Sequence, residues 1–224
     1  MVKRTFNSVV LALMVLLLAI PSFTFAQEKK PAAKPPSRVE LKLALRDLWV
    51  GHIFWVRNVV LTTKYGDKDA AKIAEEQVVQ NAKDIAHSTA PYYGKEASEK
   101  LFTLLAGHYG AIKEYMNAAF SSNKDGKKTA SDKINRNAEE IATFLSSANP
   151  NWPKQTLLAA LVAHGGHPMA QIDAINAKDF ASEAKVWDSS TDEGVSIWGL
   201  SVCIALSEVA RNQTLFRKIV ILIQ

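Results

Sequence analysis

The sequence predicts an all-α protein, a helical bundle of up-down helix hairpins built on a 56-residue internal repeat. Apolar residues recur with the 3.6-residue period of an α-helix from residue 38 onwards. Between residues 38 and 188, we find no stretch with the alternating pattern of a half-buried strand. Two short motifs return with the same fixed period, which is typical of repeated supersecondary units.

The composition limits the class of protein. The chain has 224 residues, 48% of them hydrophobic and 22% charged, which fits one soluble domain or two small ones. A single cysteine, Cys203, excludes an internal disulfide framework and a cysteine-based zinc site. The formal net charge is +5 and the sequence has no dense stripe of Lys and Arg, so we expect no nucleic-acid partner.

Residues 1–26 have the layout of a secretory signal peptide. Lys3 and Arg4 form the basic start, an apolar run occupies residues 9–20, and small residues precede a cleavage point after Ala26. An uncleaved anchor is the alternative, but this apolar run is shorter than the roughly 20 residues that span a bilayer. The sequence therefore predicts export to the periplasm or the extracellular space, with no transmembrane helix in the mature chain.

A linker and a series of helices follow in order. Residues 27–37 are rich in Pro and Lys and predict an extended, solvated linker, and residues 38–188 form the predicted bundle domain. Gly66 and Asp67 should separate the first two helices, and Pro153 should open the fifth. Gly165, Gly166 and Pro168 should kink or interrupt that helix. The expected helices span residues 38–65, 68–89, 96–120, 128–147, 153–175 and 179–187.

The internal repeat places a histidine at the same position three times, at His52, His108 and His164. The repeated segments read Leu45-x-x-Leu48-Trp49-x-Gly51-His52, Leu101-x-x-Leu104-Leu105-x-Gly107-His108 and Leu157-x-x-Ala160-Leu161-x-Ala163-His164. A second motif of the same period reads Asn81-Ala82-Lys83-Asp84-Ile85-Ala86 and Asn137-Ala138-Glu139-Glu140-Ile141-Ala142. Each unit is expected to be one helix hairpin.

The spacing also predicts a polar layer inside the bundle. The sequence separation between His52 and Asp84 equals that between His108 and Glu140. In an antiparallel hairpin this separation brings imidazole and carboxylate to about the same height. Imidazole and carboxylate ligands from facing helices suit zinc, iron or manganese. The candidate metal ligands are His52, Asp84, His108, Glu140, His164 and His167.

Two interpretations of this layer stay open. In the structural interpretation, buried histidines are satisfied by hydrogen bonds and only set the register of the helices. In the other interpretation, the layer holds a divalent metal. We found no Gly-x-Ser-x-Gly elbow, no phosphate-binding glycine loop and no His-Glu-x-x-His motif.

The chain resembles a family of bacterial secreted helical-bundle proteins that has no established activity. The resemblance covers about residues 39–188 and implies the location and architecture only. The matching segments are Leu45-Arg46-Asp47-Leu48-Trp49-x-x-His52-x-x-Trp55-x-Arg57, Asn81-x-x-Asp84-Ile85, Pro91-Tyr92-Tyr93-Gly94, Leu104-Leu105-x-x-His108, and Asn137-Ala138-x-Glu140-Ile141-Ala142-x-Phe144-Leu145-Ser146-x-Ala148-Asn149-Pro150-Asn151.

The family pattern is lost after about Asp188, and residues 189–224 form a divergent apolar tail. One hypothesis is that a change of reading frame replaced the closing helix. The other is a genuine tail that contacts a membrane surface or a protein partner. The sequence as a whole favours an exported binding protein of the cell envelope, with a small ligand, a metal or a protein as its partner. A metal-dependent hydrolase or redox enzyme and a purely structural bundle are the alternatives.

Overall fold

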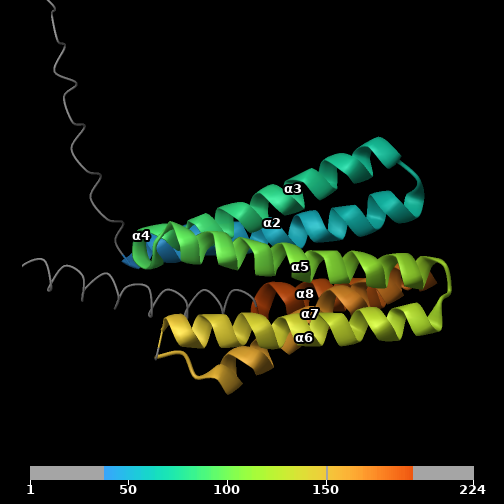
Figure 1. Cartoon of the computed structure of the whole chain (residues 1–224). Helices are drawn as coiled ribbons and strands as arrows, with labels where there is room; N and C mark the ends of the chain where they lie inside the picture. Colours follow the sequence, from blue (N-terminus) through green and yellow to red (C-terminus); the bar gives the residue numbers. More distant parts are fainter. Residues whose placement is uncertain (1–37, 150, 194–224) are drawn as a thin grey trace, which may run out of the picture. The chain divides into compact units, whose positions relative to one another are not determined.

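The computed structural model describes residues 38–149 and 151–193, and within these ranges all regular secondary structure is helical. Figure 1 shows the helices as an up-down series joined by short connections. They are α2 (Arg38–Tyr65), α3 (Lys68–His87), α4 (Ala90–Tyr93), α5 (Lys95–Phe120), α6 (Lys124–Ala148), α7 (Lys154–Ala177) and α8 (Phe180–Glu193). The all-α helical bundle predicted from the sequence is confirmed for this part of the chain.

Helix ends follow local sequence signals. The side chain of Asp67 caps α3 by accepting a hydrogen bond from the N–H of Ala70 at 2.8 Å. The side chain of Asn123 caps α6 in the same way through the N–H of Gly126 at 2.9 Å. Gly66 ends α2 with a φ of +101°, a left-handed conformation that glycine adopts without steric cost. These short connections make consecutive long helices antiparallel.

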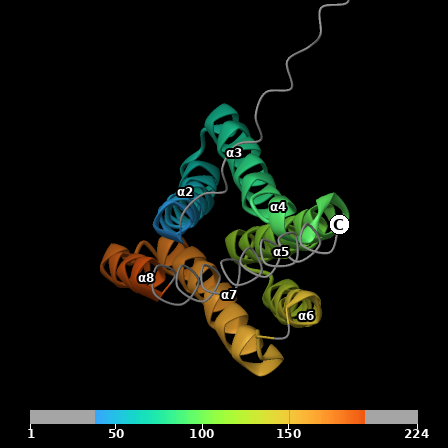
Figure 2. The ribbon, with the colours of Figure 1, turned by 90° about the vertical axis from the view of Figure 1, so that its left-hand side faces the viewer.

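Viewed along the helices, Figure 2 shows α5 between α3 and α6, and α7 between α6 and α8. Residue contacts agree with this view, since α5 packs against α3, α6 and α7, and α7 also packs against α2. Helix α7 is therefore a neighbour of both α2 and α5. These are the three helices that carry His52, His108 and His164.

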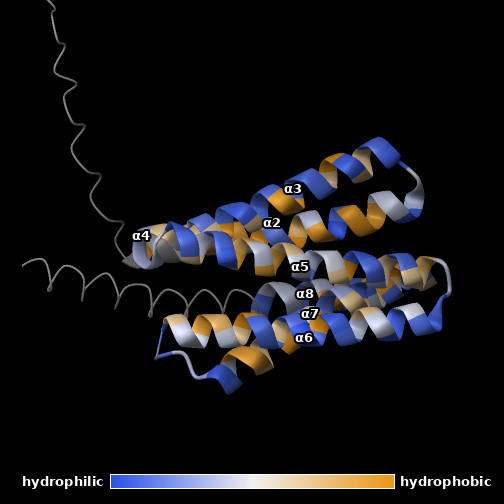
Figure 3. Cartoon of the chain, viewed as in Figure 1, coloured by the Kyte–Doolittle hydropathy of each residue, from blue (hydrophilic) through white to orange (hydrophobic). Residues whose placement is uncertain are grey.

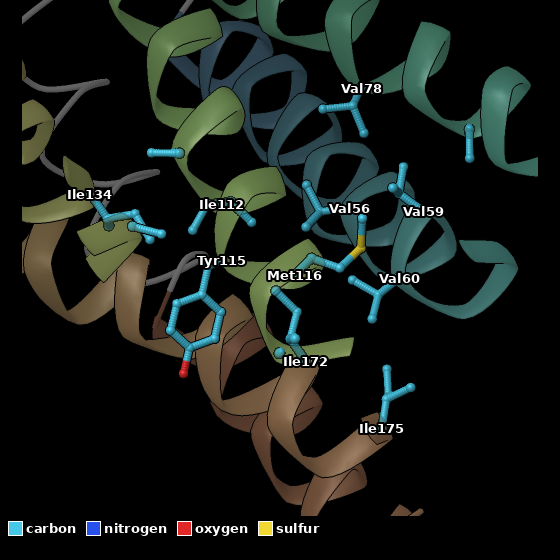
Figure 4. Packing of buried hydrophobic residues seen from close by; sticks show 14 residues of the cluster. Val56, Val59, Val60, Val78, Ile112, Tyr115, Met116, Ile134, Ile172 and Ile175 are labelled. Atoms are coloured by element: carbon cyan, nitrogen blue, oxygen red, sulfur yellow. The ribbon is translucent and has the colours of Figure 1, made fainter. Parts of the chain in front are cut away.

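Two apolar clusters fill the interior. The larger draws on every long helix except α8, and Figure 4 shows its side chains converging from α2, α3, α5, α6 and α7. Its largest fully buried members are Ile134, Ile172, Ile175, Val59, Val60 and Val78. The second cluster lies between α5, α6 and the start of α7 and includes Leu104, Ile141 and Trp152. Figure 3 shows polar and apolar residues alternating along each helix, as expected when one face is buried.

Two predicted helix boundaries are wrong, and the interruption predicted for α7 does not occur. Helix α6 begins at Lys124 and not near residue 128, because Asn123 caps it and Gly126 lies inside its first turn. Helix α7 runs without interruption through Pro168. A proline inside a helix costs about 3 kcal/mol, and burial of Leu161 and Ile172 on either side offsets that cost. Helix α8 continues beyond Trp187, to Glu193.

Several predictions fall on residues outside the described ranges. They are the signal peptide at residues 1–26, the linker at 27–37, and the tail from residue 194 onwards. Among the helices that the structure describes, none combines the length and the hydropathy needed to cross a bilayer.

Candidate functional site: a cluster of three histidines

The imidazoles of His52, His108 and His164 lie together in the interior, each supplied by a different helix. The ring centroid of His164 is 5.8 Å from that of His52 and 5.7 Å from that of His108. The ring of Trp49 packs against the same imidazole, with its centroid 4.7 Å from that of His164. The histidines of the three repeated segments thus form one cluster, here called the imidazole cluster.

Small residues next to the histidines let the helices approach closely. A Cβ atom at Gly51 would lie 3.3 Å from Nδ2 of Asn81, and one at Gly107 would lie 3.4 Å from Nδ2 of Asn137. A Cβ atom at Gly165 would lie 2.8 Å from Ile134, and it would also touch the ring of His108. Any side chain at position 165 would therefore push α7 away from α5 and α6.

Asn137 fixes the orientation and the tautomer of His108. Its Nδ2 donates to the carbonyl oxygen of Leu104 at 3.1 Å, so its Oδ1 is the atom that faces Nδ1 of His108, at 3.0 Å. Oδ1 can only accept, and Nδ1 of the imidazole must carry the proton. The other ring nitrogen, Nε2, is then an unprotonated lone pair. It is buried and has no hydrogen-bond partner among the described residues.

The first hairpin contains a looser version of the same arrangement. Nδ2 of Asn81 donates to the carbonyl oxygen of Leu48 at 2.9 Å. Its Oδ1 does not reach hydrogen-bond geometry with His52. Oδ1 of Asn81 and Nδ1 of His52 are both buried without a partner in the described part of the chain. The polar neighbour of each of these two histidines is therefore an asparagine on the second helix of its own hairpin.

The expectation that Asp84 and Glu140 join the histidines in a buried layer is wrong. Both side chains are exposed, and Asp84 accepts a hydrogen bond from Gln80 on its own helix. The buried faces of α3 and α6 pass through Ala82 and Ala138, each two positions before the acid. Two positions correspond to about 200° around a helix, which places both carboxylates on the outer side.

The second repeated motif contained the signal that would have identified the asparagines. Asn81 and Asn137 occupy the same place in both copies, three positions before the acids. Each asparagine precedes a buried alanine, so it lies at the edge of the face that packs inward. The apolar period of each helix therefore separates the asparagines from the acids, although the sequence spacing alone does not.

Burial keeps the cluster uncharged. It lowers the pKa of His52 to about 4, with further lowering by the neighbouring His108 and a smaller opposing effect of Asn81. Burial also lowers the pKa of His108. For His164, burial again lowers the pKa most, and the nearby imidazoles of His108, His52 and His167 lower it further. At pH 7 the three rings are neutral and offer lone pairs.

The cluster borders a cavity of about 150 Å³ whose lining is mostly apolar. His167 also lines it, one turn of α7 beyond His164. Three tryptophans and a ring of aliphatic side chains complete most of the wall, among them Trp49, Trp152, Trp187, Leu45, Leu101, Leu105, Ile112, Ile141 and Leu161. A cavity of this size and chemistry holds a molecule about as large as benzene.

An ion pair with a buried carboxylate holds α8 beside the cavity. Glu183 is 4% exposed and accepts hydrogen bonds from Nε of Arg57 at 2.6 Å, from its NH2 group at 3.0 Å, and from Gln171 at 2.9 Å. The hydrogen bond from Arg57 lowers the pKa of Glu183. The same guanidinium lies over the ring of Trp187, 5.4 Å from its centroid. Helices α2, α7 and α8 are thereby tied together at one side of the cavity.

The six predicted metal ligands are therefore divided by the structure. His52, His108, His164 and His167 line the cavity, whereas Asp84 and Glu140 lie outside it. In the described residues, no group of three or more His, Cys, Asp and Glu side chains is arranged so that it could hold a metal ion as it stands. Whether these imidazoles bind a metal stays a prediction.

The Asn137 interaction leads to a stability prediction. Replacing Asn137 with Leu leaves Nδ1 of His108 unpaired and removes the additional bond to the Leu104 carbonyl, which should lower the free energy of unfolding by about 2 kcal/mol. Urea unfolding of the variant measures this. Asn135→Leu is the matched control, because Asn135 lies exposed on the same helix. Equal midpoints for the two variants would show that the buried amide contributes nothing.

Comparisons with known proteins do not assign this site. No protein-family model, no curated protein and no solved structure matches the chain. The resemblance to secreted bacterial bundles stays a prediction from the motifs.

Proposed function

We propose that this chain is an exported, non-enzymatic binding protein whose ligand occupies the cavity beside the imidazole cluster. The ligand is a small and mostly apolar molecule that carries one hydrogen-bond donor. The observation that carries the proposal is the buried, unprotonated Nε2 of His108, which has no partner among the described residues and belongs to a residue lining a mostly apolar cavity. An apolar pocket with a few polar groups is the usual form of a small-molecule site.

The energetics favour a donor on the ligand. A buried acceptor without a partner costs about 1–3 kcal/mol, and a ligand hydroxyl or N–H that reaches it removes this cost. The neutral state of all three imidazoles favours a neutral ligand over an anion, since no positive charge is available in the cluster at pH 7. The tryptophans in the lining favour a flat, aromatic molecule.

Phenol and toluene test this proposal as a matched pair of probes, since they have similar size and only phenol has a donor. At pH 7.5, phenol should raise the melting temperature of the full chain through mass action and should bind about fivefold more tightly than toluene. In His108→Leu that preference should disappear. In His87→Leu it should remain, because His87 is a half-exposed residue of α3 that does not line the cavity.

Two results would overturn the proposal. If neither probe stabilises the parent chain at millimolar concentration, the cavity does not take such ligands. If phenol and toluene bind equally well to the parent and to His108→Leu, Nε2 of His108 is not the acceptor. As a control, His108→Leu without ligand should show a cooperative melting transition, which demonstrates that the variant is folded.

A divalent metal is the second candidate, favoured by the convergence of neutral imidazoles from three helices. In a tetrahedral site with metal–nitrogen distances of about 2.1 Å, imidazole centroids lie about 5 Å apart. The separations of His164 from His52 and His108, 5.8 and 5.7 Å, are larger than this, and the nearly parallel rings of His108 and His164 would have to rotate to face one ion. Asn137, which accepts from Nδ1 of His108, would act as the outer-shell partner that metal-bound histidines usually have.

Elemental analysis of the purified, untagged chain decides between the candidates. Zinc, iron or manganese at one equivalent, lost in folded His108→Leu, would support the metal candidate and keep a metal-dependent hydrolase or redox enzyme open. A metal-free chain whose melting temperature does not respond to these ions would exclude both the metal candidate and the metal-dependent enzyme. The phenol measurement is independent of this outcome.

The 56-residue repeat belongs to the same proposal. Its support is that an asparagine amide donates to a leucine carbonyl at the same sequence separation in both hairpins, from Asn81 to Leu48 and from Asn137 to Leu104. In this view each of the three repeat units contributes one histidine to the cavity wall, and His164 is the histidine of the third unit. Export to the periplasm or the extracellular space rests on the sequence of residues 1–26.

A further inference from the structure

The cavity lies beside the first turns of α7, next to which no described part of α8 packs. Helix α7 has 24 residues and α8 only 14, and the two are joined by a tight connection at Lys178 and Asp179. Because they run antiparallel, the described part of α8 ends about 15 Å short of the start of α7. The first turns of α7 are therefore without α8 beside them.

Over the same half of the bundle, α2 contacts α3 and α7 but is less deeply buried than in its second half. From Val39 to His52, none of the residues whose exposure the structure describes is fully buried, whereas Ile53, Val56, Val59 and Val60 are. The change occurs near the level where Arg57 meets Glu183 of α8. Beyond that level no described helix covers this side of α2.

The end of α8 lies at the rim of the cavity. Trp187 and Ser190 line it, and the described chain ends at Glu193, less than one turn further on. Leu45 on α2 and Leu161 on α7 line it as well. The last described turn of α8 therefore lies beside an apolar opening.

We propose that residues 195–206 cover this opening by lying along the first halves of α2 and α7. No residue of this segment is charged, whereas α8 before it is mostly polar. As a helix it would span about 18 Å, enough to cover the missing length of about 15 Å. A single glycine, Gly194, separates it from α8, so its local concentration at the opening exceeds that of a second copy or a membrane surface. The proposal does not depend on the identity of the ligand.

Cys203 lies within this segment and is the only thiol of the chain, so the unmodified full-length protein can be tested directly. Its reaction with Ellman's reagent should be at least tenfold slower in buffer than in urea. Leu45→Glu places a charge in the opening and should raise the rate towards the value in urea. Leu43→Glu makes the same change two positions away, on the exposed side of α2, and should leave the rate low.

A second pair of variants on α8 provides an independent test in case Leu45→Glu does not fold. Ser190 lines the cavity and Ser189 is exposed, so Ser190→Glu should release Cys203 and Ser189→Glu should not. Circular dichroism melting confirms that each variant is folded.

Three outcomes overturn the proposal. The first is a Cys203 that reacts equally fast in buffer and in urea, which is also what the reading-frame hypothesis predicts for the tail. The second is protection that survives Leu45→Glu and Ser190→Glu unchanged, which places the segment elsewhere. The third is protection that depends on protein concentration or requires lipid vesicles, which assigns the opening to a second copy or assigns the segment to a membrane.

Discussion

Lowering the pH from 7 to 4 should reduce the free energy of unfolding by about 3 kcal/mol through His52 alone. In the unfolded chain this histidine has an ordinary pKa of 6.5, and in the folded chain its pKa is about 4. Between these values the unfolded state binds more protons, so stability is full above pH 6.5 and falls as the pH decreases towards 4. His108 and His164, whose pKa values are also lowered, act in the same direction.

Urea unfolding at half-unit steps of pH measures this loss. In His52→Gln the stability curve should be flatter between pH 6.5 and 4.5, because one of the buried imidazoles is gone. In His87→Gln, where the replaced side chain is 39% exposed and lies 3.2 Å from Glu99, the steep part of the curve should remain. A parent protein whose stability is constant between pH 7 and 5 would contradict the lowered pKa values.

The second large effect concerns two adjacent glycines of α7. In Gly165→Ala the new Cβ would meet Cγ2 of Ile134 at 2.8 Å, which should destabilise the fold by about 1–3 kcal/mol through overpacking. In Gly166→Ala the new Cβ meets nothing within 4 Å, and the better helix propensity of alanine should stabilise the fold by up to about 1 kcal/mol. The two variants should therefore differ by about 1–4 kcal/mol.

Chemical unfolding of both variants checks the sign as well as the size of the difference. Gly165→Ala should also weaken phenol binding, since relieving the clash with Ile134 shifts α7, which carries His164 of the cavity wall. If both alanine variants were stabilised, α7 would not approach α5 and α6 as closely as the structure shows.

Most of the fold could be predicted because its signals are local. The period of apolar residues indicated the helices, and Asp67 and Gly66 marked the first connection correctly. The errors arose where tertiary packing outweighs local preference. Pro168 is tolerated in α7 because apolar side chains around it are buried, and these contacts come from helices distant in sequence.

The candidate site shows the same division. The regular spacing of His52, His108 and His164 identified the three imidazoles that the structure brings together. It could not identify their partners, because heights along two helices do not determine which side of each helix faces inward. Asp84 and Glu140 lie within one turn of the asparagines that face the histidines, but on the exposed side of their helices. The cavity could not be predicted either, since side chains from helices far apart in the sequence form its wall.

The bond from Asn137 to Leu104 has a consequence for how the second hairpin finds its partner. Sliding α6 along α5 by one turn, about 5.4 Å, would still bury alanine and isoleucine against an apolar helix. It would leave the amide of Asn137 and the imidazole of His108 without partners, at about 1–3 kcal/mol for each. The native pairing of α5 and α6 is therefore lower in free energy than a pairing shifted by one turn, by an amount that apolar contacts alone would not provide. Such a gap disfavours misregistered states during folding.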